Sequence, residues 1–368
     1  MGIFSSNHSR GDMDSAHVVA SGWRYRVSAV AIILLITAGI LVLLEGAVRW
    51  VAPPEPSPLD QAGEIITAAG LPTLADLFEP DPHLFWKLRP NLRSVRVQGM
   101  LEGYPLDFTV STDSRGRRTA PGTGGAASPV VWALGDSATF GLGVEDDETW
   151  PAWLCRIAGE YQQSLEVINY GVPGYTAWQG LHQLEQLLKS EPVPDMVVAG
   201  FWANDKAFWM GRSDPETAQL MMSRGFLTDW IQGLAISRVF RSLFSKPESD
   251  NDRPRLNERE FSGCLRQIVL LCQQRHIAAA LLVWPSRIQV EGCQQELHGY
   301  QRLVQNTAEE VGCFLINPAD RFIQSDETCF VDNFHGNAWG CKLAAEVVWE
   351  WVSDILNREK VKERTKPL

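Results

Sequence analysis

The chain has 368 residues, enough for one large domain or two small ones beside accessory segments. Apolar residues make up 45% and charged residues 21%, which excludes a collagen-like or largely disordered chain. The net charge of -11 excludes a protein that coats nucleic acid, because phosphate binding depends on concentrated Lys and Arg. The net charge does not exclude a neutral or cationic substrate.

The first element expected along the chain is an apolar run from Val27 to Leu44, eighteen residues without a charge. This length is near the minimum for crossing a bilayer and exceeds the apolar region of about 7 to 15 residues in a signal peptide. We therefore predict an uncleaved transmembrane helix, with a cleaved signal peptide as the alternative. Arg10, Arg24 and Arg26 precede the run, so the positive-inside tendency places residues 1–26 in the cytoplasm and the rest outside.

Residues 45–128 are predicted to form a linker and a small irregular β region. The stretch from Val51 to Pro58 holds four prolines and should act as a stiff, extended spacer. Residues 95–97 and 108–110 are candidates for short strands, and residues 122–128 for a loop.

From Pro129 short apolar runs alternate with amphipathic stretches, which is typical of βα units around a parallel sheet. Apolar residues recur at helical spacing over 178–188, 297–311 and 343–355. We therefore predict an α/β domain over residues 129–357, with its parallel strands at residues 130–134, 167–169, 196–201, 278–284 and 313–316.

Two stretches depart from this alternation. Residues 207–256 are longer than a simple connection and carry large apolar side chains such as Trp209 and Trp230. A packed helical insertion and a lid or membrane-facing flap both fit this stretch. The tail, residues 358–368, alternates in charge and is expected to be solvated surface.

The seven cysteines form neither a CxxC pair nor a Cys/His cluster with zinc-ligand spacing. We therefore predict no metal site. Most of these thiols are expected to be free and buried, and a disulfide between Cys313 and Cys329 is the alternative.

Two motifs carry groups suited to nucleophilic chemistry. Gly135-Asp136-Ser137 follows the first strand candidate, where open α/β sheets place their ligands. Asp332-Asn333-Phe334-His335 precedes the last helix, and its spacing lets the carboxylate reach the imidazole Nδ1, leaving Nε2 free to take a serine proton. Taken singly, the first motif also fits a turn and the second a surface pair.

Two further polar stretches, residues 169–176 and 200–205, also follow strand candidates. A backbone N–H from a glycine turn and an Asn amide would suit the oxyanion that develops in acyl transfer. The alternative for Asn204 and Asp205 is a helix cap.

These four blocks, in this order, resemble the SGNH (GDSL-like) hydrolase family: Gly135-Asp136-Ser137, the glycine turn ending at Gly174, Gly200 to Asp205, and Asp332 to His335. The resemblance covers about residues 130–357. It implies a flavodoxin-like, three-layer α/β/α fold with a five-stranded parallel sheet and no metal or organic cofactor. Residues 201–203 stand where many family members have small, glycine-rich residues before the Asn. This difference bears on the shape of the pocket and not on the chemistry.

The resemblance also implies a role for each site residue. Ser137 is the expected nucleophile, His335 its base and Asp332 the residue that orients the base. The oxyanion hole is expected from the Ser137 amide, the Gly174 amide and the Asn204 side chain. Gly174 is chosen because family members place this glycine about five residues after the leading Asn of the block.

The expected function is that of an extracytoplasmic, membrane-anchored serine esterase in the bacterial cytoplasmic membrane. Its expected partners are an acylated carbohydrate or lipid of the cell envelope and the membrane itself, through residues 27–44, and no nucleic acid. An O-acyltransferase that uses the same acyl-enzyme is the alternative, and a non-catalytic envelope scaffold is a second one. The GxSxG elbow, the P-loop and the dinucleotide glycine fingerprint are absent, which excludes those enzyme classes.

Overall fold

The computed structural model describes residues 30–47, 63, 71–101, 103–119, 128–208, 211–222, 253–292, 297 and 299–364. The chain divides into two compact units, residues 1–55 with 224–247 and residues 56–223 with 248–368.

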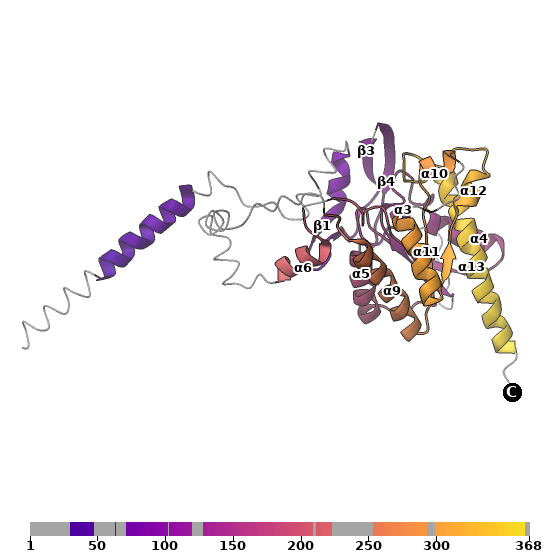
Figure 1. Ribbon diagram of the computed structural model, residues 1–368. Helices are drawn as coiled ribbons and strands as arrows, with labels where there is room; N and C mark the ends of the chain where they lie inside the picture. Colours follow the sequence, from indigo (N-terminus) through magenta and orange to yellow (C-terminus); the bar gives the residue numbers. More distant parts are fainter. Residues whose placement is uncertain are drawn as a thin grey trace, which may run out of the picture. The chain divides into compact units, whose positions relative to one another are not determined.

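Within the described part of the first unit lies one helix, Val30–Ala47, long and apolar enough to cross a bilayer (Figure 1). None of its 18 residues is buried inside the protein. The predicted apolar run is therefore helical from residue 30 and continues to residue 47. A signal sequence and a single membrane anchor both have these properties.

The second unit is built on a five-stranded sheet in the order β6-β5-β7-β8-β9, and every neighbouring pair is parallel. The whole of β7 is buried, as expected for a parallel strand covered on both faces. The predicted five-stranded parallel sheet is confirmed. The strands are β5 (Val130–Gly135), β6 (Glu166–Gly171), β7 (Met196–Gly200), β8 (Ala278–Leu282) and β9 (Phe314–Ile316).

Helices cover both faces of this sheet, which confirms the three-layer α/β/α architecture (Figure 1). Alternate residues of β5 point to opposite faces: Trp132 joins one apolar core and Val131 the other. The core around Trp132 includes α5 (Ala177–Ser190), α9 (Glu258–Gln274) and α11 (Tyr300–Val311). The core around Val131 includes α4 (Trp150–Glu160), α12 (Ala319–Ile323) and α13 (Ala338–Arg364).

Side-chain caps set where the helices beside the site begin. Thr176 and Gln179 form a capping box at the start of α5, and Asn257 and Glu260 form one at the start of α9. Each box satisfies backbone N–H groups that a helix start leaves without partners. The loops that lead into these helices are thereby held at defined positions.

The region after the linker is more regular than predicted. Its two expected strands are confirmed and form an antiparallel hairpin, β3 (Val95–Leu101) with β4 (Tyr104–Val110). A 3-10 helix, η1 (Pro72–Leu77), and a second hairpin, β1 (Phe78–Asp81) with β2 (Phe85–Leu88), were not predicted. Phe78, Trp86 and Phe108 belong to the same apolar core as β5 and α5, so both hairpins contribute side chains to the core of the second unit.

Helix α13 runs past residue 357, the predicted end of the domain, and continues to Arg364. The predicted boundary therefore falls inside a helix. The charged tail residues extend that helix, because Arg, Lys and Glu are good helix formers. Arg358 also pairs at 2.6 Å with Asp354, one turn earlier.

Some predictions fall on residues outside the described ranges. These are the cytoplasmic segment, the proline spacer and most of the predicted loop before Ser128. Of the insertion, residues 207–208, 211–222 and 253–256 are described, including helix α6 (Asp214–Met222), and the rest lies outside the description. The six described cysteines are free, Cys313 and Cys329 among them.

Candidate active site

Ser137, His335 and Asp332 form one chain of hydrogen bonds. The Nε2 atom of His335 lies 2.7 Å from Oγ of Ser137, and its Nδ1 atom lies 2.6 Å from Oδ2 of Asp332. With the ring proton on Nδ1, the imidazole donates to the carboxylate and Nε2 accepts the serine O–H. The structure therefore brings these three predicted residues together in the order that proton transfer from serine to histidine needs.

Ser137 owes its position to the sharp end of β5. The strand ends at Gly135, where an added Cβ would lie 2.8 Å from the carbonyl oxygen of Gly200 in the neighbouring strand β7. Asp136 then caps the one-turn helix α3 (Ser137–Phe140) by accepting the N–H of Ala138 at 2.9 Å. Ser137 is the first residue of this helix, so its backbone N–H has no acceptor within the helix.

Asp136 is a buried carboxyl beside the serine. Burial raises its pKa to about 6, against the lowering effects of the Ala138 amide and of the charge on His335. The capping carboxyl group therefore changes its charge within two pH units of neutrality, next to Ser137.

Asp332 is almost completely buried, with 1% of its surface exposed. Its Oδ1 atom accepts the backbone N–H groups of Phe334 at 2.8 Å and His335 at 2.7 Å. Burial alone would raise the pKa of Asp332, but the hydrogen bonds and charge of His335, with these amides, outweigh it and hold the pKa below its usual value. The carboxylate is thus charged at neutral pH and stabilises a protonated imidazole.

The three oxyanion-hole candidates follow neighbouring strands. Ser137 comes after β5, Gly174 after β6 and Asn204 after β7, and β5 lies between the other two strands. Because the strands are parallel, all three residues lie at the carboxyl edge of the sheet. The Nδ2 group of Asn204 donates to the carbonyl of Tyr175 at 3.1 Å, which leaves its second N–H for another acceptor.

Two glycines in the turn after β6 have amides in different situations. The N–H of Gly171 donates to Oδ1 of Asn169 at 2.9 Å. The N–H of Gly174 donates to no other residue of the described ranges. Gly174 has a φ of 82°, and a Cβ there would lie 3.1 Å from Cζ2 of Trp86, so both backbone and space favour glycine. Of the two amides, that of Gly174 is the one left for a ligand.

Asp205 binds the start of a helix, which is close to the helix-cap alternative predicted for it, although the N-cap residue of this helix, α5, is Thr176. Its Oδ1 atom accepts the N–H of Ala177, the first residue of α5, at 2.7 Å. Its Oδ2 atom is buried without a hydrogen-bond partner in the described part of the chain. Burial raises the pKa of Asp205 to about 8, although the nearby Arg255 lowers it.

Sequence reasoning missed the contacts that hold the glycine turn. Arg255 donates to the carbonyl of Gly174 at 2.6 Å and to the carboxylate of Asp214 at 2.9 and 2.8 Å. Asp214 also accepts the hydroxyl of Thr176 at 2.6 Å. The indole N–H of Trp86 donates to the carbonyl of Pro173 at 3.1 Å. No sequence signal marks Arg255 and Asp214, since an isolated Arg or Asp in an insertion resembles a surface residue.

Metal ligation has no candidate in the described ranges: no group of three or more His, Cys, Asp or Glu side chains there is arranged to hold an ion.

A parallel α/β/α sheet with a Ser-His-Asp array at its carboxyl edge is the architecture of a serine hydrolase, and the class indicated is that of hydrolases acting on ester bonds. The model of the GDSL-like Lipase/Acylhydrolase family matches residues 133–343, more than half of the sequence. The chain belongs to this family.

Individual relatives are distant or match over short stretches. An arylesterase of Vibrio mimicus is 37% identical over 79 residues, which are 22% of this chain and 39% of that protein. The psychrotrophic esterase EstA of Pseudoalteromonas sp., inhibited by monoethylphosphonate, is 15% identical with a TM-score of 0.38 and covers 62% of this chain and 100% of its own. The acetyl xylan esterase AlAXEase is 16% identical with a TM-score of 0.41, and the match covers 61% of this chain and 99% of that chain.

Proposed function

We propose that this protein is an extracytoplasmic, membrane-anchored serine esterase that cleaves acyl esters of envelope carbohydrate or lipid. Ser137 is the nucleophile, His335 the general base and acid, and Asp332 the residue that orients and stabilises the imidazole. The single observation that carries the proposal is the hydrogen-bond chain of 2.7 and 2.6 Å through these three side chains.

Acylation begins when the Oγ atom of Ser137 attacks the ester carbonyl and its proton passes to Nε2 of His335. The backbone N–H groups of Ser137 and Gly174 and the side-chain N–H of Asn204 would donate hydrogen bonds to the negatively charged carbonyl oxygen. The bond from the carbonyl carbon to the alcohol oxygen then breaks. That oxygen takes the proton from Nε2, and the acyl group stays on Ser137.

Deacylation repeats these steps with water. Nε2 of His335 accepts a proton from a water molecule whose oxygen attacks the acyl carbon. The bond from that carbon to Oγ breaks, Oγ recovers the proton from Nε2, and the carboxylic acid leaves. The lowered pKa of Asp332 supports this cycle, because its negative charge stabilises the imidazolium formed in each half.

The proposed site of action follows from the N-terminus. An uncleaved helix at Val30–Ala47, after the arginines at 10, 24 and 26, would hold residues 1–26 in the cytoplasm and the esterase domain on the other side of the membrane. Acylated envelope polymers and lipids are the esters within reach of such a domain. Retention in membranes after an alkaline carbonate wash supports the anchor. A soluble product whose N-terminus begins after residue 47 refutes it.

The nucleophile is tested with the purified full chain in detergent. We expect a fluorophosphonate probe to label Ser137 and p-nitrophenyl acetate to be hydrolysed. Ser137→Ala should abolish both, whereas Ser190→Ala, at an exposed serine in α5, should abolish neither. Undiminished turnover by folded Ser137→Ala would exclude the proposed nucleophile.

The same preparation separates hydrolysis from transfer. Sugar acceptors are added at increasing concentration and the products are identified by mass spectrometry. An esterase releases the acyl group as free acid at every acceptor concentration. Acylated sugar that replaces the free acid would assign the O-acyltransferase activity instead.

A further inference from the structure

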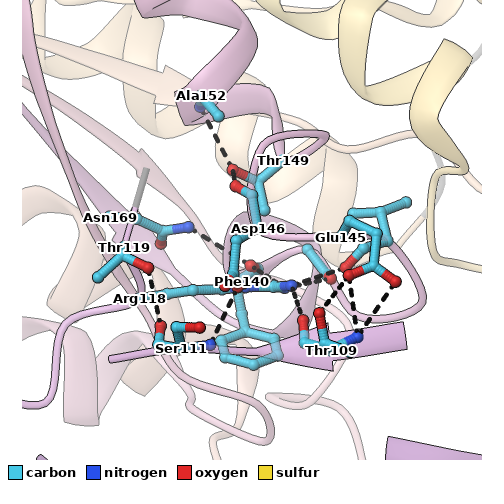
Figure 2. Close-up of polar contacts among 12 residues, drawn as sticks. Thr109, Ser111, Arg118, Thr119, Phe140, Glu145, Asp146, Thr149, Ala152 and Asn169 are labelled. Atoms are coloured by element: carbon cyan, nitrogen blue, oxygen red, sulfur yellow. Dashed lines mark hydrogen bonds and ion pairs between the residues drawn. The ribbon is translucent and has the colours of Figure 1, made fainter. Parts of the chain in front are cut away.

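Arg118 is a fully buried arginine in the segment between β4 and β5, before the stretch that the family model matches. Its guanidinium uses all five of its N–H groups (Figure 2). Four go to carbonyl oxygens and one to a carboxylate. The acceptors and distances are Phe140 O 2.9 Å, Gly141 O 2.6 Å, Thr109 O 3.1 Å, Val144 O 2.6 Å and Asp146 Oδ1 2.9 Å.

Two of these acceptors belong to the end of the helix that begins with Ser137. Helix α3 has four residues, and Phe140 and Gly141 are its last residue and its C-cap. A single turn is the costly nucleus of a helix, and its last carbonyls have no partners within it. Asn169 of β6 supports the same end by donating to the carbonyl of Thr139 at 3.1 Å. The position of α3 therefore depends on donors from outside the helix.

The other contacts of Arg118 tie this helix to the β3–β4 hairpin. One Nη2 hydrogen bond reaches the carbonyl of Thr109 in β4 and another that of Val144 in the loop after α3. Asp146 of the same loop accepts from Arg118 and from the backbone N–H of Ser111 at 3.2 Å. Arg118 thus joins the hairpin, the loop and α3 at one buried point (Figure 2).

Burying a guanidinium costs desolvation free energy, and replacing a buried ion pair with apolar residues of similar volume is often neutral or stabilising. Its value lies in directed geometry, because the planar fork fixes several acceptors relative to one another. Here the acceptors lie on the short helix that carries the nucleophile.

We propose that Arg118 is a positioning residue for Ser137: it holds α3 so that Oγ stays within hydrogen-bond distance of Nε2 of His335. The proposal rests on the proposed esterase function and deepens it. It assigns part of the active-site machinery to a segment outside the family match.

The test compares Arg118→Met and Arg118→Lys with the wild type, as full chains in detergent. Turnover is expressed per serine labelled by fluorophosphonate at completion, so that unfolded protein is not counted. We expect Arg118→Met to lower kcat by about 10- to 100-fold with KM within about twofold, because displacements near 1 Å have effects of that order. Arg118→Lys, which keeps the charge and three donors, should recover part of the loss.

The matched control is Arg117→Met. Arg117 is the neighbouring residue, but its guanidinium donates to Asp113 at 2.6 Å and not to α3. We expect its kcat per labelled serine to equal that of the wild type. The rate of fluorophosphonate labelling should slow in the Arg118 variants and not in this control, because labelling needs the same serine and histidine geometry.

The outcomes separate the two proposals. Wild-type kcat per labelled serine in Arg118→Met, with only a lower melting temperature, would overturn the positioning role. If Arg118→Met does not fold, the decision passes to Arg118→Lys, where an unchanged kcat overturns it equally. Inactivity of the wild type, or activity of Ser137→Ala, would instead refute the proposed function.

Discussion

Asp332 binds His335 at two places: its Oδ1 atom accepts the backbone N–H of His335 at 2.7 Å, and its Oδ2 atom lies 2.6 Å from Nδ1 of the ring. A hydrogen bond from the N–H of Val331 to the carbonyl of His335, at 2.9 Å, closes the loop between them. One carboxylate therefore fixes both the main chain and the ring plane of the histidine.

Asp332→Asn should leave the loop folded and remove most activity. The Asn carbonyl can still accept the two backbone N–H groups, but an amide N–H facing Nδ1 favours the ring tautomer with its proton on Nε2, which cannot accept the serine proton. We expect kcat to fall by about 10⁴-fold, the loss known for this change in a Ser-His-Asp triad. Steady-state kinetics with p-nitrophenyl acetate measure it.

The control for this variant is Asp326→Asn, at an exposed position of the preceding loop. Its kcat should equal that of the wild type. A loss of less than about tenfold in folded Asp332→Asn would contradict the role given to Asp332, since a tautomer effect of the expected size is far larger.

Asn204→Ala tests the oxyanion hole. The side-chain amide follows β7, and the first of its two N–H groups is engaged by Tyr175. If the second meets the oxyanion, its loss should lower kcat by about 10²- to 10³-fold and change KM little, because the interaction forms in the transition state. A variant with unchanged kcat and raised KM would assign Asn204 to substrate binding instead.

Arg255→Met alone should destabilise the protein more than Arg255→Met combined with Asp214→Asn. The single variant leaves the carboxylate of Asp214, 1% exposed, buried without its guanidinium, which costs about 3 to 5 kcal/mol. Arg255→Met with Asp214→Asn removes both charges and keeps an acceptor for Thr176, so it should be more stable than the single variant. Urea unfolding followed by circular dichroism measures both, and equal or greater instability of the double variant would contradict a buried ion pair.

The sequence was sufficient for the parts of the fold that repeat a simple pattern. The strand at residues 196–200 is apolar throughout and buried on both faces, and its neighbours β5 and β8 are also apolar runs, so the length of these runs and the helical stretches between them identify the sheet. The hairpin of β1 and β2 escaped prediction because each strand has four residues, and Pro80 interrupts the first.

The candidate site was predictable where short motifs occur in a family order: Ser137 follows β5, and Asp332 and His335 precede α13. Arg118 and Arg255 were not predictable, because their partners are backbone carbonyl groups, which every residue has, and side chains far away in sequence. Only the folded chain brings Arg255 to Gly174, 81 residues away in sequence. The residues that position the site therefore have no recognisable sequence motif, whereas the residues proposed to react do.

The burial of Asp205 provides a prediction for stability against pH. Burial raises its pKa to about 8 in the folded chain. In the unfolded chain the carboxyl group loses its proton near its ordinary pKa of about 3.9. Between these values the folded state holds the extra proton, so the contribution of Asp205 to stability is complete below about pH 4, falls as pH rises, and is lost above about pH 8.

Asp205→Asn should remove this dependence. The Asn carbonyl can keep the hydrogen bond from the N–H of Ala177 that Oδ1 accepts at 2.7 Å, and the group has no charge at any pH. The free energy of unfolding of the variant, relative to the wild type, should therefore rise between pH 5 and pH 8 by up to about 1.4 kcal/mol per pH unit and then level off. Urea titrations at pH 5, 6, 7, 8 and 9 measure the difference, with the exposed Asp326→Asn as the control whose difference stays flat. A difference that is constant across this range would mean that Asp205 is already ionised in the folded protein at pH 5, and would contradict the raised pKa.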